Sequence, residues 1–229
     1  METLENPFSF LDIFVYLFPG LIVFFTIAWF FIPENQVPDI WVFFSETKDF
    51  KYIFLFLALI IMYSLGHIVS SFGSCVFEKG LVKNCLGYPR DNFFRNEKKS
   101  RWPFIYYGVN YSEQFRERFQ VIFENCFGEF TNQDKFILCF TFVKENCPTT
   151  FGRINTFISL YDFSRNSAAA LIILSITFFL KSYFIYGFLT FIFAFLFTFR
   201  YLKFFQLHSD EIFRTFYVYN HNRFNDQEK

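Results

Sequence analysis

The chain has 229 residues, of which 53 % are hydrophobic and 26 % aromatic, and this composition lies above the range of soluble domains. Its 21 basic and 21 acidic residues give a formal net charge of zero, which argues against a nucleic-acid binder that relies on phosphate attraction. The length is typical of one domain. Composition alone therefore favours a membrane protein.

Two long uncharged runs predict the first two membrane spans. Residues 13–32 and 52–77 contain 20 and 26 residues without Asp, Glu, Lys or Arg. At about 1.5 Å per helical residue, each run covers the roughly 30 Å hydrocarbon layer. The first run is not expected to be a cleaved signal peptide, because the residues before it carry two glutamates and no lysine or arginine.

Two shorter runs predict a second pair of spans. Residues 166–180 and 182–199 are separated only by Lys181, and one helix through both would be too long for a single crossing. We expect two short spans, with Arg165 and Lys181 extending toward the lipid headgroups. The 15 residues of the third run also fit a buried core helix of a soluble domain.

The positions of lysine and arginine predict the topology. With four spans, one side of the membrane holds 18 of the 21 basic residues, and the other side holds Lys48, Lys51 and Lys181. The positive-inside rule then places both termini and the segment 78–165 in the cytoplasm. The predicted organisation is a transmembrane hairpin over 1–77, a cytoplasmic helical subdomain over 78–165, and a second hairpin with a cytoplasmic helical tail over 166–229.

The subdomain begins with a segment that predicts little regular structure, since 78–110 contains three glycines and two prolines. Apolar residues then recur at helical spacing between Ser112, which suits an N-cap, and Gly128, which suits the position after a helix end. A second helix is expected from Thr131, where Thr131-Asn132-Gln133-Asp134 forms a capping-box pattern, to Pro148.

A third helix, from about residue 151 to 165, is placed to continue into the third span. After residue 199 the tail keeps apolar residues at helical spacing, which predicts that the fourth span extends into the cytoplasm and packs on the subdomain. The five cysteines show no C-x-x-C pair, so we expect buried thiols, no metal site and no cofactor.

The second span carries a polar face in its cytoplasmic half. Its members lie at i, i+3, i+7 and i+10 of one helix: Ser64, His67, Ser71 and Ser74. Beside it lies a strip of small residues that lets helix backbones approach closely: Gly66, Ser70 and Gly73. One interpretation is tight helix packing, with His67 donating to a neighbouring carbonyl. The other is a polar conduit or a subunit interface in which His67 is the titratable group.

Pro19 and Gly20 weaken the first span near its middle and predict a kink. The kink could serve as a hinge or only as a packing feature, and the sequence favours neither.

Catalytic motifs are few. The pair Arg214 and His221, in a region expected to be helical, resembles the arginine-to-histidine spacing of HEPN ribonucleases. In such enzymes the imidazole handles protons and the guanidinium holds phosphate. Thr215 departs from the polar amide, histidine or charged residue that the family usually has after the arginine. A solvated helix end is the competing interpretation.

Short motifs in the order of the spans resemble those of small bacterial membrane proteins from anti-phage loci, nearest the four-span accessory protein of type VI-B, RNA-targeting CRISPR systems. The motifs that carry this resemblance are Pro19-Gly20, Leu65-Gly66-His67, Ser164-Arg165-Asn166 and Arg200-Tyr201. The resemblance covers the whole chain as architecture, although each motif is only two or three residues long. It implies an accessory or effector that acts with a nucleic-acid-sensing complex, and it supplies no catalytic residue.

The sequence thus predicts an all-α, multi-pass protein of the bacterial inner membrane with four transmembrane helices. The leading hypothesis is an oligomeric accessory or effector in phage defence that alters membrane permeability or recruits a partner. Its expected partners are the lipid bilayer, further copies of the chain and a cytoplasmic defence complex, with no direct contact to nucleic acid. The alternatives are a membrane-tethered HEPN-like ribonuclease that uses Arg214 and His221, and a non-catalytic scaffold.

Overall fold

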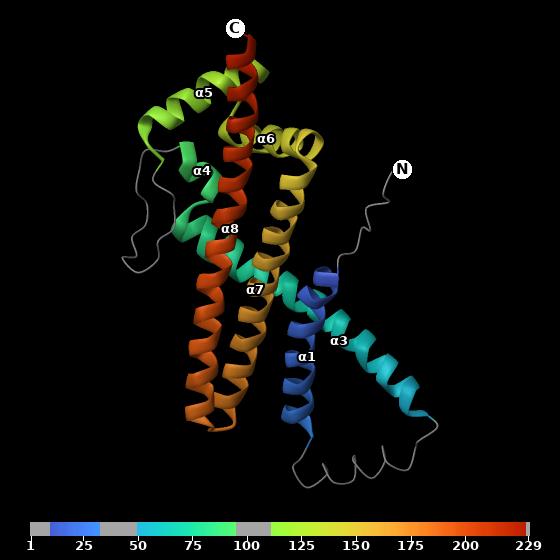
Figure 1. The fold of residues 1–229 in the computed structure, drawn as a ribbon. Coiled ribbons are helices and arrows are strands. Elements are labelled where there is room, and N and C mark those ends of the chain that lie inside the picture. The colour runs from blue at the N-terminus through green and yellow to red at the C-terminus, as the bar shows by residue number, and fades with distance from the viewer. Residues whose placement is uncertain (1–9, 33–49, 95–110, 228–229) are drawn as a thin grey trace. The chain divides into compact units, whose positions relative to one another are not determined.

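A computed structural model of the chain describes residues 10–32, 50–94 and 111–227, and these residues form helices and no strand. The first half contains α1 (Phe10–Phe31), α3 (Lys51–Gly73), the π-helix η3 (Ser74–Leu86), α4 (Pro89–Phe94) and α5 (Glu113–Phe127). The second half contains α6 (Asn132–Asn146) and two long helices, α7 (Pro148–Leu180) and α8 (Phe184–Gln227) (Figure 1). The predicted all-α class is confirmed.

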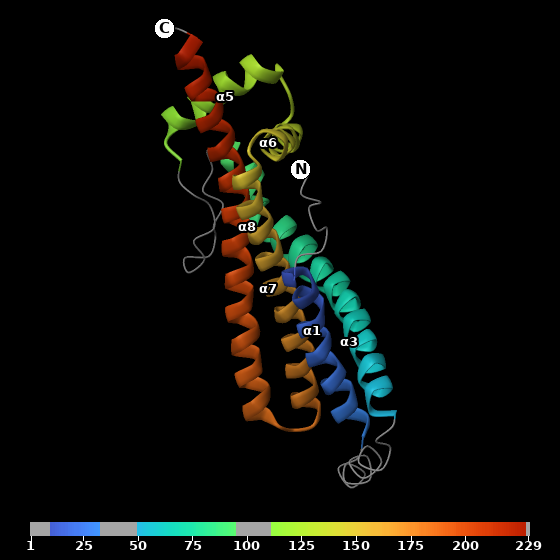
Figure 2. The same cartoon turned by 45° about the vertical axis from the view of Figure 1, so that its right-hand side comes forward.

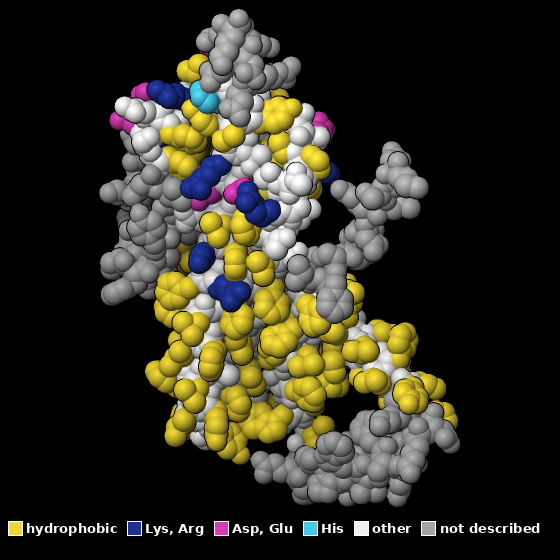
Figure 3. Space-filling model, in the orientation of Figure 1, with side chains coloured by type: hydrophobic (Ala, Val, Ile, Leu, Met, Phe, Trp, Pro, Cys, Tyr) yellow, Lys and Arg dark blue, Asp and Glu magenta, His cyan; other side chains and the backbone are white. Residues whose placement is uncertain are grey.

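Four helical segments are long and apolar enough to cross a membrane. They are Ile13–Phe31, Tyr52–Asp91, Pro148–Leu180 and Phe184–His221. Each overlaps one of the four predicted spans almost entirely or contains it, so the four-span assignment is confirmed on length and composition. Figure 3 shows hydrophobic side chains gathered over α1, α3 and the halves of α7 and α8 that adjoin the turn between them, as a lipid-facing bundle requires.

The chain divides into two units. Unit 1 comprises Met1–Phe77 and Asp162–Tyr201, and unit 2 comprises Glu78–Tyr161 and Leu202–Lys229. Both α7 and α8 contribute a segment to each unit, because each is a single uninterrupted helix. The predicted continuation of the third helix into the third span is therefore present in α7, and the predicted extension of the fourth span is present in α8.

The core of unit 1 is formed by α7. Every residue from Ser164 to Ala170 is buried, so this helix is covered on all sides over nearly two turns. Within unit 1, α7 and α8 lie antiparallel and side by side in both views (Figures 1 and 2), and Ser175 Oγ donates to Gly187 O at 2.8 Å. The small residues Ala168, Ala169 and Ala170 allow the neighbouring helices to approach it closely.

The core of unit 2 is built from phenylalanine rings on four helices. Phe93 of α4 stacks on Phe213 of α8 with centroids 4.3 Å apart, and Phe119 of α5 packs edge-on against both. Cys139 and Val143 of α6 complete the same buried cluster. The rings bury large apolar areas, which is the main stabilising term available to a unit of this size.

Helix ends in unit 2 follow the predicted capping residues. Ser112 accepts from Phe115 N at 3.2 Å at the start of α5, and Gly128 (φ +88°) follows its end. Thr131 accepts from Asp134 N at the start of α6, at 3.4 Å, and Pro148 begins the next helix. Both predicted helices are confirmed, because capping is a local interaction that a few neighbouring side chains decide.

The prediction of little regular structure over 78–110 is wrong for its first part. Residues 78–86 belong to η3, and α4 covers Pro89–Phe94. Gly87 (φ +79°) ends η3, and Pro89 takes the first position of α4, where its missing N–H is tolerated. These residues therefore mark a helix end and a helix start. Residues 95–110 lie outside the described part of the chain.

Candidate functional site

Two of the glycines that the sequence singled out, Gly20 of α1 and Gly66 of α3, lie where α1 crosses α3. A Cβ atom added at Gly20 would lie 1.7 Å from Met62 O, and one added at Gly66 would lie 2.0 Å from Tyr16 O. The two backbones are therefore in direct contact, and only glycine fits at either position. The third small residue of the strip, Gly73, faces Ala169 and Arg165 of α7.

Pro19 makes a further contact of α1 available. A proline has no N–H, so the carbonyl of Val15, four residues earlier, lacks its usual helical donor. Asn166 Nδ2 of α7 donates to Val15 O at 3.3 Å, and both Asn166 and Pro19 are buried. In this structure Pro19 and Gly20 thus serve the packing of α1 against α7 and α3.

Arg165 is buried beside this contact. Its guanidinium forms an ion pair with Asp162 Oδ1 at 2.8 Å, donates to Ser70 Oγ at 3.1 Å, and donates through Nε to Asn166 Oδ1 at 3.3 Å. Only 7 % of Arg165 is exposed, so the expectation that its side chain extends alone toward headgroups is wrong. The sequence signal that could have shown this is the i, i+3 spacing of Asp162 and Arg165 on one helix.

Lys181 contacts the C-terminal end of α1. Its Nζ donates to Trp29 O at 3.0 Å and lies 4.8 Å from the centroid of the Trp29 ring. Trp29 lies in the last turn of α1, where carbonyls have no helical donor, and residue 33 is a proline. A lysine at a helix C-terminus also interacts favourably with the helix dipole.

The predicted polar face of α3 lies on the surface of unit 1. Ser64 and Ser71 are exposed, and each hydroxyl donates to the carbonyl four residues earlier, Ile60 O at 2.8 Å and His67 O at 3.1 Å. Ser74, at the start of η3, is half-buried. The small-residue strip faces the interior of unit 1, so α3 presents glycines inward and hydroxyls outward.

His67 is exposed on this same face. Its ring stacks on Tyr16 of α1 with centroids 4.0 Å apart, and Tyr63 packs edge-on against it at 4.7 Å. The two tyrosines fix the plane of the imidazole. The ring is thus oriented by aromatic contacts while one side of it stays open at the surface.

Arg214 and His221 lie on unit 2, in the same helix. They are seven positions apart in sequence, so they share a face of α8 but lie about 10 Å apart along its axis. Arg214 Nε donates to Tyr111 OH at 3.2 Å, and the His221 ring stacks on Tyr217 at 5.4 Å. The two side chains do not contact each other.

Two buried titratable groups in α8, His208 and Asp210, were not predicted from the sequence. Burial raises the pKa of Asp210 to about 6, an effect that Tyr111 and Arg214 partly oppose. Burial lowers the pKa of His208 to about 4, and neither of its ring nitrogens has a hydrogen-bond partner among the described residues. The signal that could have found them is a group of four polar residues within five positions of an apolar helix: Gln206, His208, Ser209 and Asp210.

Among the described residues, no group of three His, Cys, Asp or Glu side chains is placed to hold a metal ion. Cys139 is buried, but Cys75, Cys85 and Cys126 are exposed, so the expectation of buried thiols is wrong for these three. Burial raises the pKa of the Cys139 thiol well above its usual range, which keeps it protonated and unreactive.

No protein-family model, no curated protein and no solved structure matches this chain.

Proposed function

We propose that this chain is an integral membrane protein that self-associates through the polar face of α3 and changes the permeability of the membrane. The observation that carries the proposal is the exposed His67 on a helix whose composition suits hydrocarbon. An imidazole that faces lipid leaves its nitrogens without hydrogen-bond partners, which costs free energy. A second α3 packed against the first would supply them.

The serines on this face fit such a role. The hydroxyls of Ser64 and Ser71 bond to their own helix, so both residues are tolerated in lipid before assembly. Against a second copy the same oxygens can accept hydrogen bonds. The face is thus suited to reversible assembly inside a bilayer.

A path for solutes would have to lie between copies. The middle of unit 1 is filled by the buried segment of α7, Ser164 to Ala170, so the described residues of one copy enclose no polar channel at this level. A ring of chains that direct Ser64, His67 and Ser71 toward a common axis would line such a path with hydroxyl and imidazole groups.

Cross-linking tests the self-association. In a background without the five native cysteines, Ser71→Cys should form disulfide-linked dimers in native membranes. Phe72→Cys is the matched control, because Phe72 is exposed at the same depth but about 100° around the helix. Equal cross-linking of the two variants, or none from Ser71→Cys, would contradict the proposal.

A membrane-potential dye in expressing cells tests the permeability. Loss of potential is expected with the natural chain and not with His67→Ala or Ser71→Leu. An unchanged effect of both variants would rule out a conduit at this face, and cross-linking without any effect on the potential would favour a scaffold. The bacterial inner membrane, cytoplasmic termini and the phage-defence setting are proposed on the lysine and arginine distribution and the motif resemblance alone.

A further inference from the structure

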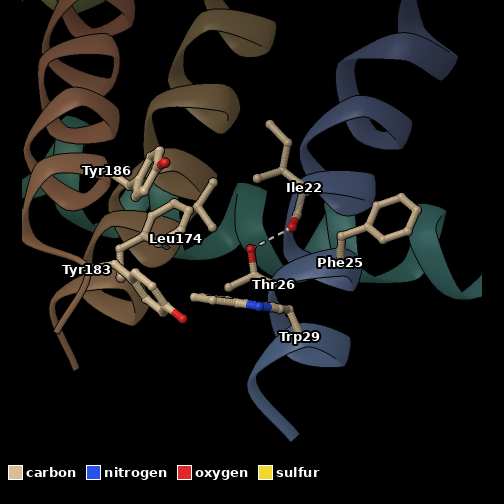
Figure 4. Close-up of a pocket in the computed structure, with 8 residues that line it drawn as sticks. Ile22, Phe25, Thr26, Trp29, Leu174, Tyr183 and Tyr186 are labelled. Carbon is tan, nitrogen blue, oxygen red and sulfur yellow. Dashed lines mark hydrogen bonds between the residues drawn. The ribbon is translucent and has the colours of Figure 1, made fainter. Parts of the chain in front are cut away.

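Unit 1 has an apolar groove at the end where α1 and α7 terminate and α8 begins. Its volume is about 520 Å³, within the range of small-molecule and lipid pockets. Figure 4 shows Tyr183 and Tyr186 on one wall, Thr26 and Trp29 of α1 on the other, and Leu174 of α7 between them. The groove therefore runs between three helices that we assign to the membrane.

The walls of the groove are mostly apolar, and the polar atoms of the lining side chains are the hydroxyls of Thr26, Tyr183 and Tyr186 and the indole nitrogen of Trp29 (Figure 4). The Thr26 hydroxyl donates to Ile22 O at 2.7 Å within α1, so this hydroxyl is already satisfied by its own helix (Figure 4). The remaining walls are rings and aliphatic chains, including Phe25 and Phe178. Such a surface matches a hydrocarbon chain and not a polar solute.

The positively charged Lys181 lies at one end of the groove. Lys181 Nζ lies 4.8 Å from the centroid of the Trp29 ring, which lines the groove, and uses one of its three protons on Trp29 O. No carboxylate among the described residues forms an ion pair with it. Tyrosine, tryptophan and lysine together are the side chains that mark the headgroup level of a bilayer.

We infer that this groove binds one anionic phospholipid, with an acyl chain along the apolar walls and the headgroup phosphate on the free protons of Lys181. Charge complementarity selects the anionic lipid, since a lysine at the membrane surface attracts it. The inference does not rest on the self-association of α3, because groove and polar face share no residue.

The fluorescence of Trp29, which lines the groove, can report lipid binding directly. The chain has three tryptophans, so Trp41→Phe with Trp102→Phe leaves Trp29 as the only one. In bilayer discs of phosphatidylcholine, acyl-brominated phosphatidylglycerol should quench Trp29 fluorescence and saturate at a low mole fraction. Acyl-brominated phosphatidylcholine should quench only in proportion to its mole fraction, as any surrounding lipid does.

Variants at Lys181 and Leu174 test the headgroup contact and the acyl-chain groove separately. Lys181→Gln should weaken the preference for phosphatidylglycerol about five-fold, and Lys181→Arg should retain it. Leu174→Phe leaves the charge in place and fills the groove, so it should abolish the saturable quenching. Phe188→Leu, on an exposed part of α8, is the control that should change nothing.

Quenching by phosphatidylglycerol that simply follows its mole fraction would overturn the inference. Saturation that is equal for both lipids would also overturn it, because the groove would then accept any acyl chain. Saturation that survives in both Lys181→Gln and Leu174→Phe would place the bound lipid elsewhere on the chain.

Discussion

At the scale of single residues, two carbonyls of α1 that lack a helical donor accept hydrogen bonds from α7 and from the turn that follows it. Asn166 donates to Val15 O near one end of α1, and Lys181 donates to Trp29 O near the other. Val15 and Trp29 each lie four residues before a proline, Pro19 and residue 33. Because a proline cannot donate, both carbonyls are open to a side chain from a neighbouring helix.

The first prediction concerns Asn166→Ala. Loss of the amide leaves Val15 O buried without its donor and should cost about 1 to 3 kcal/mol of unfolding free energy. In a Pro19→Ala background, residue 19 regains an N–H that can bond Val15 O, so the same substitution should cost about 1 kcal/mol less. Unfolding of the four proteins of this cycle in detergent measures the coupling. Strictly additive losses would show that the two residues act independently.

Two buried groups in α8 oppose each other in their response to pH. Burial raises the pKa of Asp210 to about 6 from the ordinary 3.8, so the folded form holds its proton more tightly and stability falls as pH rises through this range. Burial lowers the pKa of His208 to about 4 from 6.5, so stability rises as pH rises from about 4 to 6.5. The natural chain should therefore show a nearly flat stability between about pH 4 and 6.

The second prediction follows from this balance. Asp210→Asn removes the falling contribution, so the unfolding free energy should rise by about 3 kcal/mol between pH 4 and 6.5. His208→Phe should produce the opposite slope, and it should stabilise the protein near pH 5 because a phenyl ring fits among Phe136, Phe140 and Tyr161. Denaturant titrations over this pH range provide the measurement. A flat profile for Asp210→Asn would contradict the assignment.

At the scale of helices, the crossing of α1 and α3 depends on the absence of side chains at two positions. A Cβ at Gly66 would lie 2.0 Å from Tyr16 O, which is backbone and cannot move aside alone. The third prediction is that Gly66→Ala destabilises the protein by about 3 kcal/mol or more, since α1 and α3 must separate.

Gly152→Ala is the matched control for this substitution. Gly152 lies in α7, is exposed, and has nothing within 4 Å of an added Cβ. Alanine there should stabilise the protein by about 0.5 to 1 kcal/mol, because it lowers the conformational freedom of the unfolded chain. Thermal unfolding of the two variants should therefore shift in opposite directions. Shifts of the same sign would mean that the crossing is looser than described.

The features that could be predicted from the sequence are those that a local interaction or a single length decides. The caps Ser112, Gly128 and Thr131 depend on side chains within a few residues, and the four spans depend on the thickness of a bilayer. The features that could not be predicted pair residues far apart in the chain. The sequence marks Gly20 as part of a predicted kink and Gly66 as part of a small-residue strip, yet nothing local shows that the two glycines meet.

The candidate site shows the same dependence on contacts between residues that are far apart in the chain. Ser64, His67 and Ser71 share a face because helical spacing requires it, but their exposure depends on where α1 and α7 pack. Arg165 is expected from the sequence to extend toward lipid headgroups, but it bonds to its neighbour Asn166 and, across the fold, to Ser70, a contact that nothing local predicts. The prolines did contain a usable signal, since any proline in a membrane helix frees the carbonyl four residues earlier.

At the scale of the whole molecule, α7 and α8 set the topology, because each is one uninterrupted helix and a short turn joins them at Lys181 to Tyr183. If each crosses the membrane once, this turn and the turn between α5 and α6 must lie on opposite sides. Of the 21 basic residues, 18 fall on the side of the α5 to α6 turn by this assignment, which favours the cytoplasm for that side.

The fourth prediction tests that assignment with single cysteines in a background without the five native ones. Ser182 and Glu129 are exposed residues of the two turns. In intact cells, a membrane-impermeant maleimide should label Ser182→Cys and should reach Glu129→Cys only after the membrane is opened. Equal labelling of both in intact cells would show that α7 and α8 do not cross. Labelling of Glu129→Cys alone would reverse the orientation, and the basic residues would then face outward against the charge rule.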